Sequence, residues 1–276
     1  MSSLVYNFLV QGADIFPRPL SKLWNKCQIM LTLCEPWSRA IQTVTLTIHR
    51  FSGLAHRLWV IGQMGAAHLA FRAMPDCGFY KLCGSGTGEG FTPRPNWGVW
   101  VILAAWPDLA TAQARVGDAA VYRRWARRAD EVYTLFLTPT SARGTWSGKT
   151  PFQAETVPVS GPIAALTRAT VKPATMMKFW GRVPDISTAI GMDKNVAFKI
   201  GIGDVPLLRQ VTFSVWPDTE SMAHFARADG PHAQAIKAVR AGDWFAEELY
   251  ARFAVSATRG TWGGHDPLAR FESLAA

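Results

Sequence analysis

The chain has 276 residues, of which 49% are hydrophobic and 18% charged, and its formal net charge is +9. This length suits one large domain or two of about 100–130 residues, and the composition excludes a mainly disordered chain. Lysine and arginine never run longer than two in sequence, which disfavours nucleic acid and suits an anionic membrane, an acidic electron donor or a cofactor with carboxylates.

The first segment, residues 1–43, has no clear hydrophobic period and contains Pro17, Pro19 and Pro36. It lacks the order of a signal peptide, and no window of about 18 apolar residues predicts a transmembrane helix. The four cysteines form no CxxC pair, which disfavours a structural zinc site and indicates a reducing compartment. We therefore expect an N-terminal extension outside the fold, in a cytoplasmic protein.

Residues 44–149 predict one compact unit. Val44–Phe51 alternates strand-forming residues, and an apolar-periodic helix follows at about 54–73, closed by Pro75. Strands at 78–85 and 97–106, a helix at 109–130 capped by Asp108, and a strand at 132–142 complete the unit. The order β-α-β-β-α-β is typical of a ferredoxin-like unit.

Residues 165–268 predict the same order again, after a proline-containing linker at 150–164 and before a tail at 269–276. The elements are a strand at 165–172, a helix at 175–190, strands at 196–202 and 208–215, an interrupted helix at 219–248, and a strand at 250–258. Four stretches recur in order: RLW and KFW, FYKLCGSG and FKIGIG, AAWPD and FSVWPD, SARGTW and SATRGTW. We predict an α+β fold of tandem ferredoxin-like repeats, forming a pseudo-twofold pair of facing sheets like a dimeric α/β barrel, with helices outside.

Two glycine-rich stretches resemble nucleotide-binding loops without matching them. The GKT at Gly148–Thr150 lacks the first glycine of a P-loop, since Arg143 stands there, and a proline-containing linker follows instead of a helix. In Gly84–Phe91 the sixth position of a dinucleotide motif is Glu89. The latter stretch is an insertion in the first repeat, either a plain hairpin loop or a substrate loop.

Differences between the repeats indicate where a single cofactor site would lie. His232 follows Pro231 at a predicted helix start, with Asp229 as the expected N-cap, and the first repeat has no histidine at the matching point. The positive helix end lowers the pKa of such a histidine and favours the neutral imidazole that binds metals. The alternative is an ordinary surface or capping histidine. Cys83 could be a thiolate ligand or a small buried residue.

Several stretches together resemble the spheroidene monooxygenase family, the ketolases of acyclic carotenoids. They are FYKLCGSGTGEGFTPRPN, GPIAALTRATVKP, FWGRVP, NVAFKIGIGDVPLLRQVTFSVWPD and DGPHAQAIKAVRAGDWFAEELYARF, and the resemblance spans about 44–268. It implies a haem-dependent monooxygenase that uses O2 and electrons, from a donor such as ferredoxin, to oxidise C-2 of acyclic carotenoids such as spheroidene to a ketone.

The resemblance also implies site residues. His232 would be the proximal iron ligand, and Arg168, Lys199 and Arg182 would contact haem propionates or donate to bound oxygen, unless they are solvated ends of strands and helices. A carotenoid substrate implies peripheral contact with a membrane, for which apolar loops such as 91–100 are candidates. Two alternatives stay open: another monooxygenase of the dimeric α/β-barrel type, and a non-catalytic haem- or lipid-binding protein.

Overall fold

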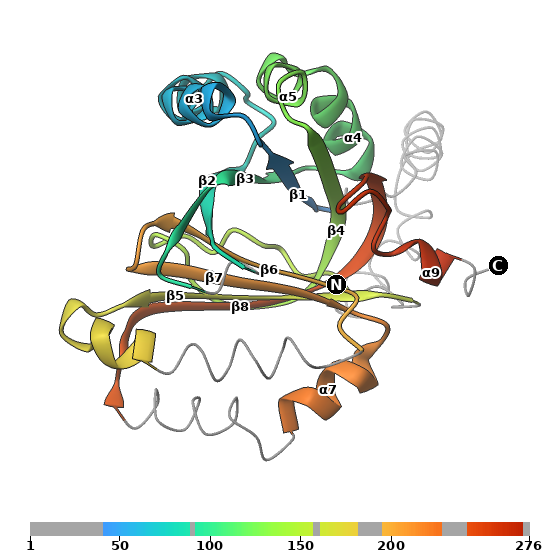
Figure 1. Cartoon of the computed structure of the whole chain (residues 1–276). Helices are drawn as coiled ribbons and strands as arrows, with labels where there is room; N and C mark the ends of the chain where they lie inside the picture. The colour runs from blue at the N-terminus through green and yellow to red at the C-terminus, as the bar shows by residue number, and fades with distance from the viewer. Residues whose placement is uncertain (1–40, 89–91, 157–160, 182–194, 228–241, 273–276) are drawn as a thin grey trace, which may run out of the picture. The chain divides into compact units, whose positions relative to one another are not determined.

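The computed structural model describes residues 41–88, 92–156, 161–181, 195–227 and 242–272 (Figure 1). Within these ranges the strands are β1 (Thr43–Arg50), β2 (Phe79–Gly86), β3 (Pro95–Trp106), β4 (Glu131–Gly144), β5 (Ile163–Val171), β6 (Phe198–Val205), β7 (Arg209–Trp216) and β8 (Phe245–Gly260). The helices are α3 (Leu54–Arg72), α4 (Leu109–Asp118), α5 (Ala120–Ala126), the 3-10 helix η2 (Pro173–Thr175), α7 (Thr219–Arg227) and α9 (Ala269–Glu272).

All the strands join one closed antiparallel barrel in the order β1-β3-β2-β6-β7-β5-β8-β4. The predicted α+β class with a barrel-like sheet is confirmed. The prediction of two facing sheets is corrected, because hydrogen bonds between β4 and β8 and between β2 and β6 connect the two halves into one barrel.

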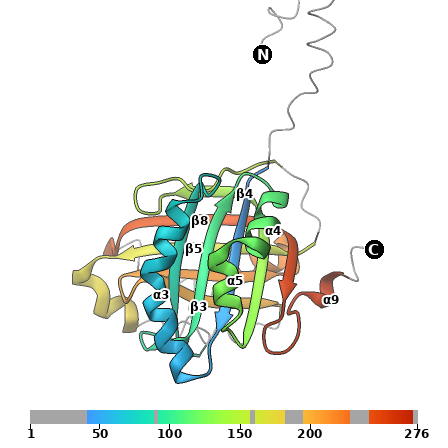
Figure 2. The same ribbon diagram turned by 90° about the horizontal axis from the view of Figure 1, so that it is seen from above.

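The barrel interior is the main hydrophobic core, and side chains from every strand fill it. In β1, Val44, Leu46 and Ile48 point inward with no exposed surface, while the alternating threonines point outward. Those threonines are also buried, because α3, α4 and α5 cover this part of the barrel (Figure 2). The hydroxyl of Thr45 accepts a hydrogen bond from Trp106 Nε1 at 3.0 Å, which satisfies two polar groups in the buried layer.

Two predicted helices differ from the observed ones. The predicted helix at 109–130 is broken at Ala119, whose backbone is extended, so that α4 and α5 are separate. The predicted interrupted helix at 219–248 is wrong at its end, because β8 begins at Phe245. Residues 245–253 have helix-favouring alanine and glutamate, yet Leu249, Ala251 and Phe253 alternate into the barrel core, and pairing with β4 and β5 overrides the local propensity.

The helix predicted at 175–190 is described only in part: η2 and residues 176–181 are helical. In the described part of the chain, no helix combines the length and apolar character that crossing a bilayer requires.

Candidate functional site

The two RGTW motifs end the last strand of each half in matching tight turns. Trp146 N donates to Lys149 O at 2.8 Å, and Trp262 N donates to His265 O at 2.8 Å. Gly148 lies inside the first turn at φ +72°, and no helix follows it. The GKT sequence is therefore part of a β-turn and forms no phosphate-binding loop.

Each turn is held by a carboxylate from the other half of the chain. Glu247 Oε1 accepts hydrogen bonds from Gly148 N at 2.7 Å and from Thr145 Oγ1 at 2.9 Å. Glu131 Oε1 accepts one from Gly264 N at 2.8 Å. These reciprocal contacts tie the two halves together at both turns.

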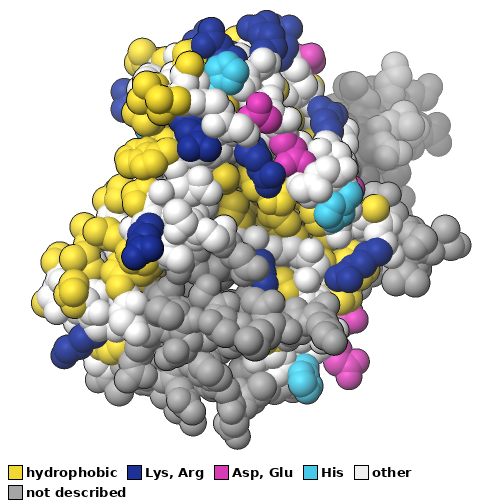
Figure 3. Space-filling model, viewed as in Figure 1, with side chains coloured by type: hydrophobic (Ala, Val, Ile, Leu, Met, Phe, Trp, Pro, Cys, Tyr) yellow, Lys and Arg dark blue, Asp and Glu magenta, His cyan; other side chains and the backbone are white. Residues whose placement is uncertain are grey.

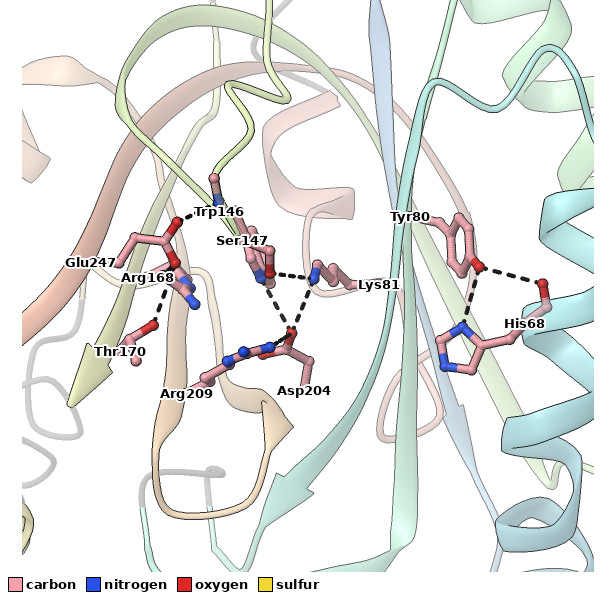
Figure 4. Close-up of polar contacts among 11 residues, drawn as sticks. His68, Tyr80, Lys81, Trp146, Ser147, Arg168, Thr170, Asp204, Arg209 and Glu247 are labelled. Carbon is pink, nitrogen blue, oxygen red and sulfur yellow. Dashed lines mark hydrogen bonds and ion pairs between the residues drawn. The ribbon is translucent and has the colours of Figure 1, made fainter. Parts of the chain in front are cut away.

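Arg168, a predicted cofactor contact, belongs to the Glu247 cluster (Figure 4). Its Nη1 lies 2.5 Å from Glu247 Oε2, its side chain has no exposed surface, and its guanidinium lies 5.8 Å from the Trp146 ring centroid. Burial alone would raise the pKa of Glu247, but hydrogen bonds from Gly148, Thr145 and the turn backbone, together with the Arg168 charge, lower it to about 2. This placement favours a structural role for Arg168 over contact with a cofactor.

A second carboxylate, Asp204, completes the closure of this end of the barrel (Figure 4). Its Oδ2 lies 3.2 Å from Lys81 Nζ and 3.4 Å from both Arg209 Nη1 and Trp146 Nε1. Lys81 also donates to Ser147 Oγ at 2.8 Å. Lys81 and Arg209 therefore balance the charge of Asp204, and Trp146, which contacts the same carboxylate, is fully buried.

The surroundings of Trp262 are open instead. Two adjoining cavities of about 330 and 280 Å³ share Trp262, Asn96 and Val99 in their walls. The larger cavity is also lined by Phe198, Lys199, Ile200 and His265, and the smaller by Arg50 and Arg57. The Arg50 guanidinium lies 4.2 Å from the Trp262 ring centroid. The combination of apolar walls and a cationic rim is typical of a site for an apolar ligand with a polar end.

The outer face of the second half differs sharply from that of the first. Its two middle strands, β5 and β7, carry several small side chains on this face. One of them, Thr167, pairs with Thr212 and Tyr250 and is exposed. In the first half, Thr47 pairs with Ile102 and Thr134 and is only 1% exposed. The small side chains of the second face are Ala165, Thr167, Ala169, Thr212 and Ser214. Of these, Ala169 and Ser214 are buried and Ala165 packs beside Trp216 and Met222, whereas Thr167 is exposed.

The remaining predicted residues are placed as follows. Lys199 lies on β6, half-buried, in the wall of the larger cavity. His232 and Arg182 lie outside the described residues. Burial raises the pKa of Cys83, which points into the barrel core with no exposed surface, so the thiolate interpretation is disfavoured. Among the residues with described positions, no three His, Cys, Asp or Glu side chains are grouped to bind a metal ion.

The carboxylates that hold the turns were missed from the sequence, although a signal exists. Glu131 and Glu247 each precede the arginine of their own RGTW motif by twelve positions. That constant spacing places both carboxylates at the same point of the last strand in each half. The sequence contains no comparable signal for the cavity at Trp262, because residues from segments far apart in the chain form its walls.

Comparison with known proteins identifies the family. The chain is 56% identical over 239 residues to a spheroidene monooxygenase of Cereibacter sphaeroides, covering 86% of this chain and 73% of that one. It is 51% identical over 228 residues to a spheroidene monooxygenase of Rhodobacter capsulatus, covering 82% and 95%. No protein-family model matches the chain.

Among solved structures, an aldoxime dehydratase in complex with butyraldoxime covers 79% of this chain, and 80% of its own chain is matched. Its TM-score is 0.55 at 9% sequence identity, so this likeness concerns the fold alone. The sequence identities of 56% and 51% to the two spheroidene monooxygenases are far higher and extend over most of the chain. The chain belongs to the spheroidene monooxygenase family of oxidoreductases.

Proposed function

We propose that this protein is a haem-dependent monooxygenase that hydroxylates the C-2 end of acyclic carotenoids such as spheroidene and converts it to a ketone. O2 and a reduced donor, ferredoxin in the simplest case, would be the co-substrates. The observation that carries the substrate class is the 56% identity to a protein named spheroidene monooxygenase. Repeated hydroxylation of one carbon gives a geminal diol, which loses water to form the ketone.

We infer further that the two halves are copies of one β-α-β-β-α-β unit. Both halves have their strands in the same relative order within the barrel, β4-β1-β3-β2 and β8-β5-β7-β6. Both end in an RGTW turn held by a carboxylate. A feature needed only for folding can occur in both copies, whereas a site for one cofactor is expected in one of them.

The outer face of the second half is our candidate location for a haem group. Haem would supply the binding and reduction of O2. Lys199, Ser214, Ala165 and Arg252 form one row across β6, β7, β5 and β8, so that two cations flank small side chains. The small side chains would accept a flat macrocycle, and the cations could pair with its carboxylates. His232, which no structural observation places, is our candidate for the iron ligand.

The cavity beside Trp262 supports the apolar substrate. Val99, Phe198 and Ile200 line it and continue into the barrel core, which is itself filled by side chains. A polyene therefore cannot thread through the barrel, and its end would be held at the cavity. These apolar side chains would contact and orient the chain end.

The absorption spectrum of the purified protein tests the cofactor. We expect a Soret band in the wild type, its loss or displacement in His232→Ala, and its retention in the control His224→Ala, an exposed histidine on α7. Incubation with spheroidene, O2 and a reductant should give a ketone. Ketone formation by a protein without a Soret band would indicate another monooxygenase of this barrel type. Haem without product would indicate a non-catalytic haem-binding protein.

A further inference from the structure

Helix α3 exposes an apolar face that the fold does not use. Its buried side, with Val60, Ala67 and Phe71, packs on the barrel. Its opposite side carries large aliphatic residues at helical spacing, and their exposed fractions are 72% for Leu54, 61% for Leu58, 40% for Ile61 and 67% for Leu69. A surface helix of a water-soluble domain normally has a polar outer side. An apolar patch of this kind marks an interaction surface.

The glycines of α3 make this face smoother. Gly62 and Gly65 lie between the aliphatic side chains, and a Cβ atom built on either would meet no atom within 4 Å. The helix contains no Asp or Glu, and Arg72 ends it. The whole outer side is therefore available to a broad apolar partner without a buried carboxylate.

Arginines between positions 123 and 128, in α5 and directly after it, lie beside α3. Helix α5 packs beside α3, where Arg124 Nη1 donates to Gln63 Oε1 at 3.3 Å and the Arg128 guanidinium lies 4.5 Å from the Trp59 ring centroid (Figure 2). Arg123 and Arg127 of the same segment are exposed. Figure 3 shows hydrophobic side chains over α3 with lysine or arginine side chains beside them. Aliphatic residues with adjacent arginines are the composition of helices that lie in the surface of anionic membranes.

Other charged and aromatic groups near α3 are consistent with this arrangement. Two exposed carboxylates, Asp118 and Asp130, lie before and after α5, and Asp130 accepts a hydrogen bond from Ser52 N. Trp97, 54% exposed, precedes Gly98, whose backbone binds Phe51 beside the start of α3. Tryptophan is the side chain most typical of the membrane interface. The arginines thus outnumber these two acids, and an exposed aromatic residue is next to the strand position that bonds to a residue shortly before α3.

We propose that α3, with the arginines at positions 123–128 and with Trp97, docks this protein on an anionic lipid bilayer. The aliphatic side chains enter the acyl boundary and the arginines bind headgroup phosphates. An acidic protein partner would use the arginines but would not need four aliphatic side chains in a row. The smaller cavity at Arg57 and Trp262 opens at the same end of α3, so a molecule leaving the bilayer would reach it directly. The docking itself does not depend on the identity of the substrate or cofactor.

Vesicle flotation of the full chain tests the proposal without carotenoid, so that its outcome is separate from that of the proposed function. We expect binding to vesicles of phosphatidylcholine and phosphatidylglycerol in equal parts, and weak binding to phosphatidylcholine alone. Leu54→Gln/Leu58→Gln and Arg123→Gln/Arg127→Gln should each weaken binding roughly tenfold. Added salt should weaken the wild type as well.

The matched control is Met177→Gln/Leu207→Asn, which removes exposed apolar side chains from the other half. We expect it to bind as the wild type does, and all variants to keep the wild-type melting temperature. Equal binding to neutral and anionic vesicles, or unchanged binding of the Leu54/Leu58 variant, would overturn the proposal. A wild-type dimer that the Leu54/Leu58 variant converts to a monomer would instead make this face a subunit interface and would also overturn it.

Discussion

Arg168 is a cation inside a barrel that is otherwise lined mainly by aliphatic and aromatic side chains. Its ion pair with Glu247 offsets the cost of removing the charge from water, while its Nε and Nη2 have no hydrogen-bond partner among the described residues. Glu247 also accepts hydrogen bonds from the RGTW turn of the first half. The pair therefore connects the core of the barrel to the turn that closes it.

Unequal costs are expected when each partner of this pair is removed. Glu247→Gln leaves the buried Arg168 cation without its counter-charge and should lower the free energy of unfolding by about 3–5 kcal/mol. Arg168→Met leaves Glu247 with its hydrogen bonds to the turn and should cost roughly 1–2 kcal/mol. Urea unfolding measures both. A larger loss of stability for Arg168→Met than for Glu247→Gln would contradict the claim that Glu247 is needed to compensate the buried Arg168 charge.

His49 makes stability depend on pH. Burial lowers the pKa of His49 to about 3, with a partial offset from the backbone of Trp100, so the folded protein holds the neutral ring. The unfolded chain binds a proton near pH 6.5, so stability falls as the pH drops below that value. Between pH 7 and pH 5 the loss should be about 2 kcal/mol. Urea unfolding at both pH values should show that His49→Gln removes most of this dependence, and an unchanged slope would contradict it.

The two RGTW turns depend on glycines that no other residue can replace. Gly144 has φ +99° and Gly260 has φ +89°, and a Cβ atom on either would lie 2.1 Å from a backbone oxygen, of Glu248 and Val132 respectively. Such contact requires the turn to move away from the neighbouring strand. The arginine and tryptophan around each glycine are thus placed by a backbone approach that only glycine permits.

Alanine substitutions separate the two effects at these turns. Gly144→Ala and Gly260→Ala should each lower stability by about 2–4 kcal/mol, because strain adds to a steric clash. Gly148→Ala is the control: its φ is +72° but a Cβ atom would meet nothing within 4 Å, so about 1 kcal/mol is expected. Thermal unfolding of the three variants checks this order. Equal melting temperatures of the three variants would show that the close approach of the backbone oxygen does not add to the cost of the substitution.

The bounds of most helices and strands were predicted from the sequence to within a few residues. The prediction failed where strand pairing overrides the local helix preference. The strand and helix at the start of the first half are found close to the predicted bounds. Phe245–Glu248 was predicted to be helical because its residues favour helix, but β8 extends over it to pair with β5. Local patterns carry no information about a partner strand that lies about 80 positions earlier.

The two halves of the barrel are joined by two strand pairs, the β4–β8 seam and the β2–β6 seam, which differ in length. β4 pairs with β8 along almost its whole length, whereas β2 pairs with β6 only at Gly84–Gly203 and Ser85–Ile202. The hydroxyl of Ser85 adds one hydrogen bond to Gly201 O at 2.9 Å. The cavities beside Trp262 border this weak seam. The barrel should therefore open first between β2 and β6.

Hydrogen–deuterium exchange measures this difference. Peptides covering 198–203 should exchange faster than peptides covering 250–257, because fewer cross-strand bonds must break to expose them. Ser85→Ala should accelerate exchange at the first site alone. Uniform protection of both seams would mean that the barrel opens only by global unfolding.

The α+β class and the family could be read from the sequence alone, because alternation, helix period and long matching stretches are properties of the chain read in order. The roles of individual side chains depend on the folded barrel. Arg168 is paired inside the barrel, Lys199 lines a cavity, and Trp146 and Trp262 have different surroundings within identical motifs. Each outcome depends on strands that are distant in sequence and adjacent only after the barrel closes, so no local pattern could contain it.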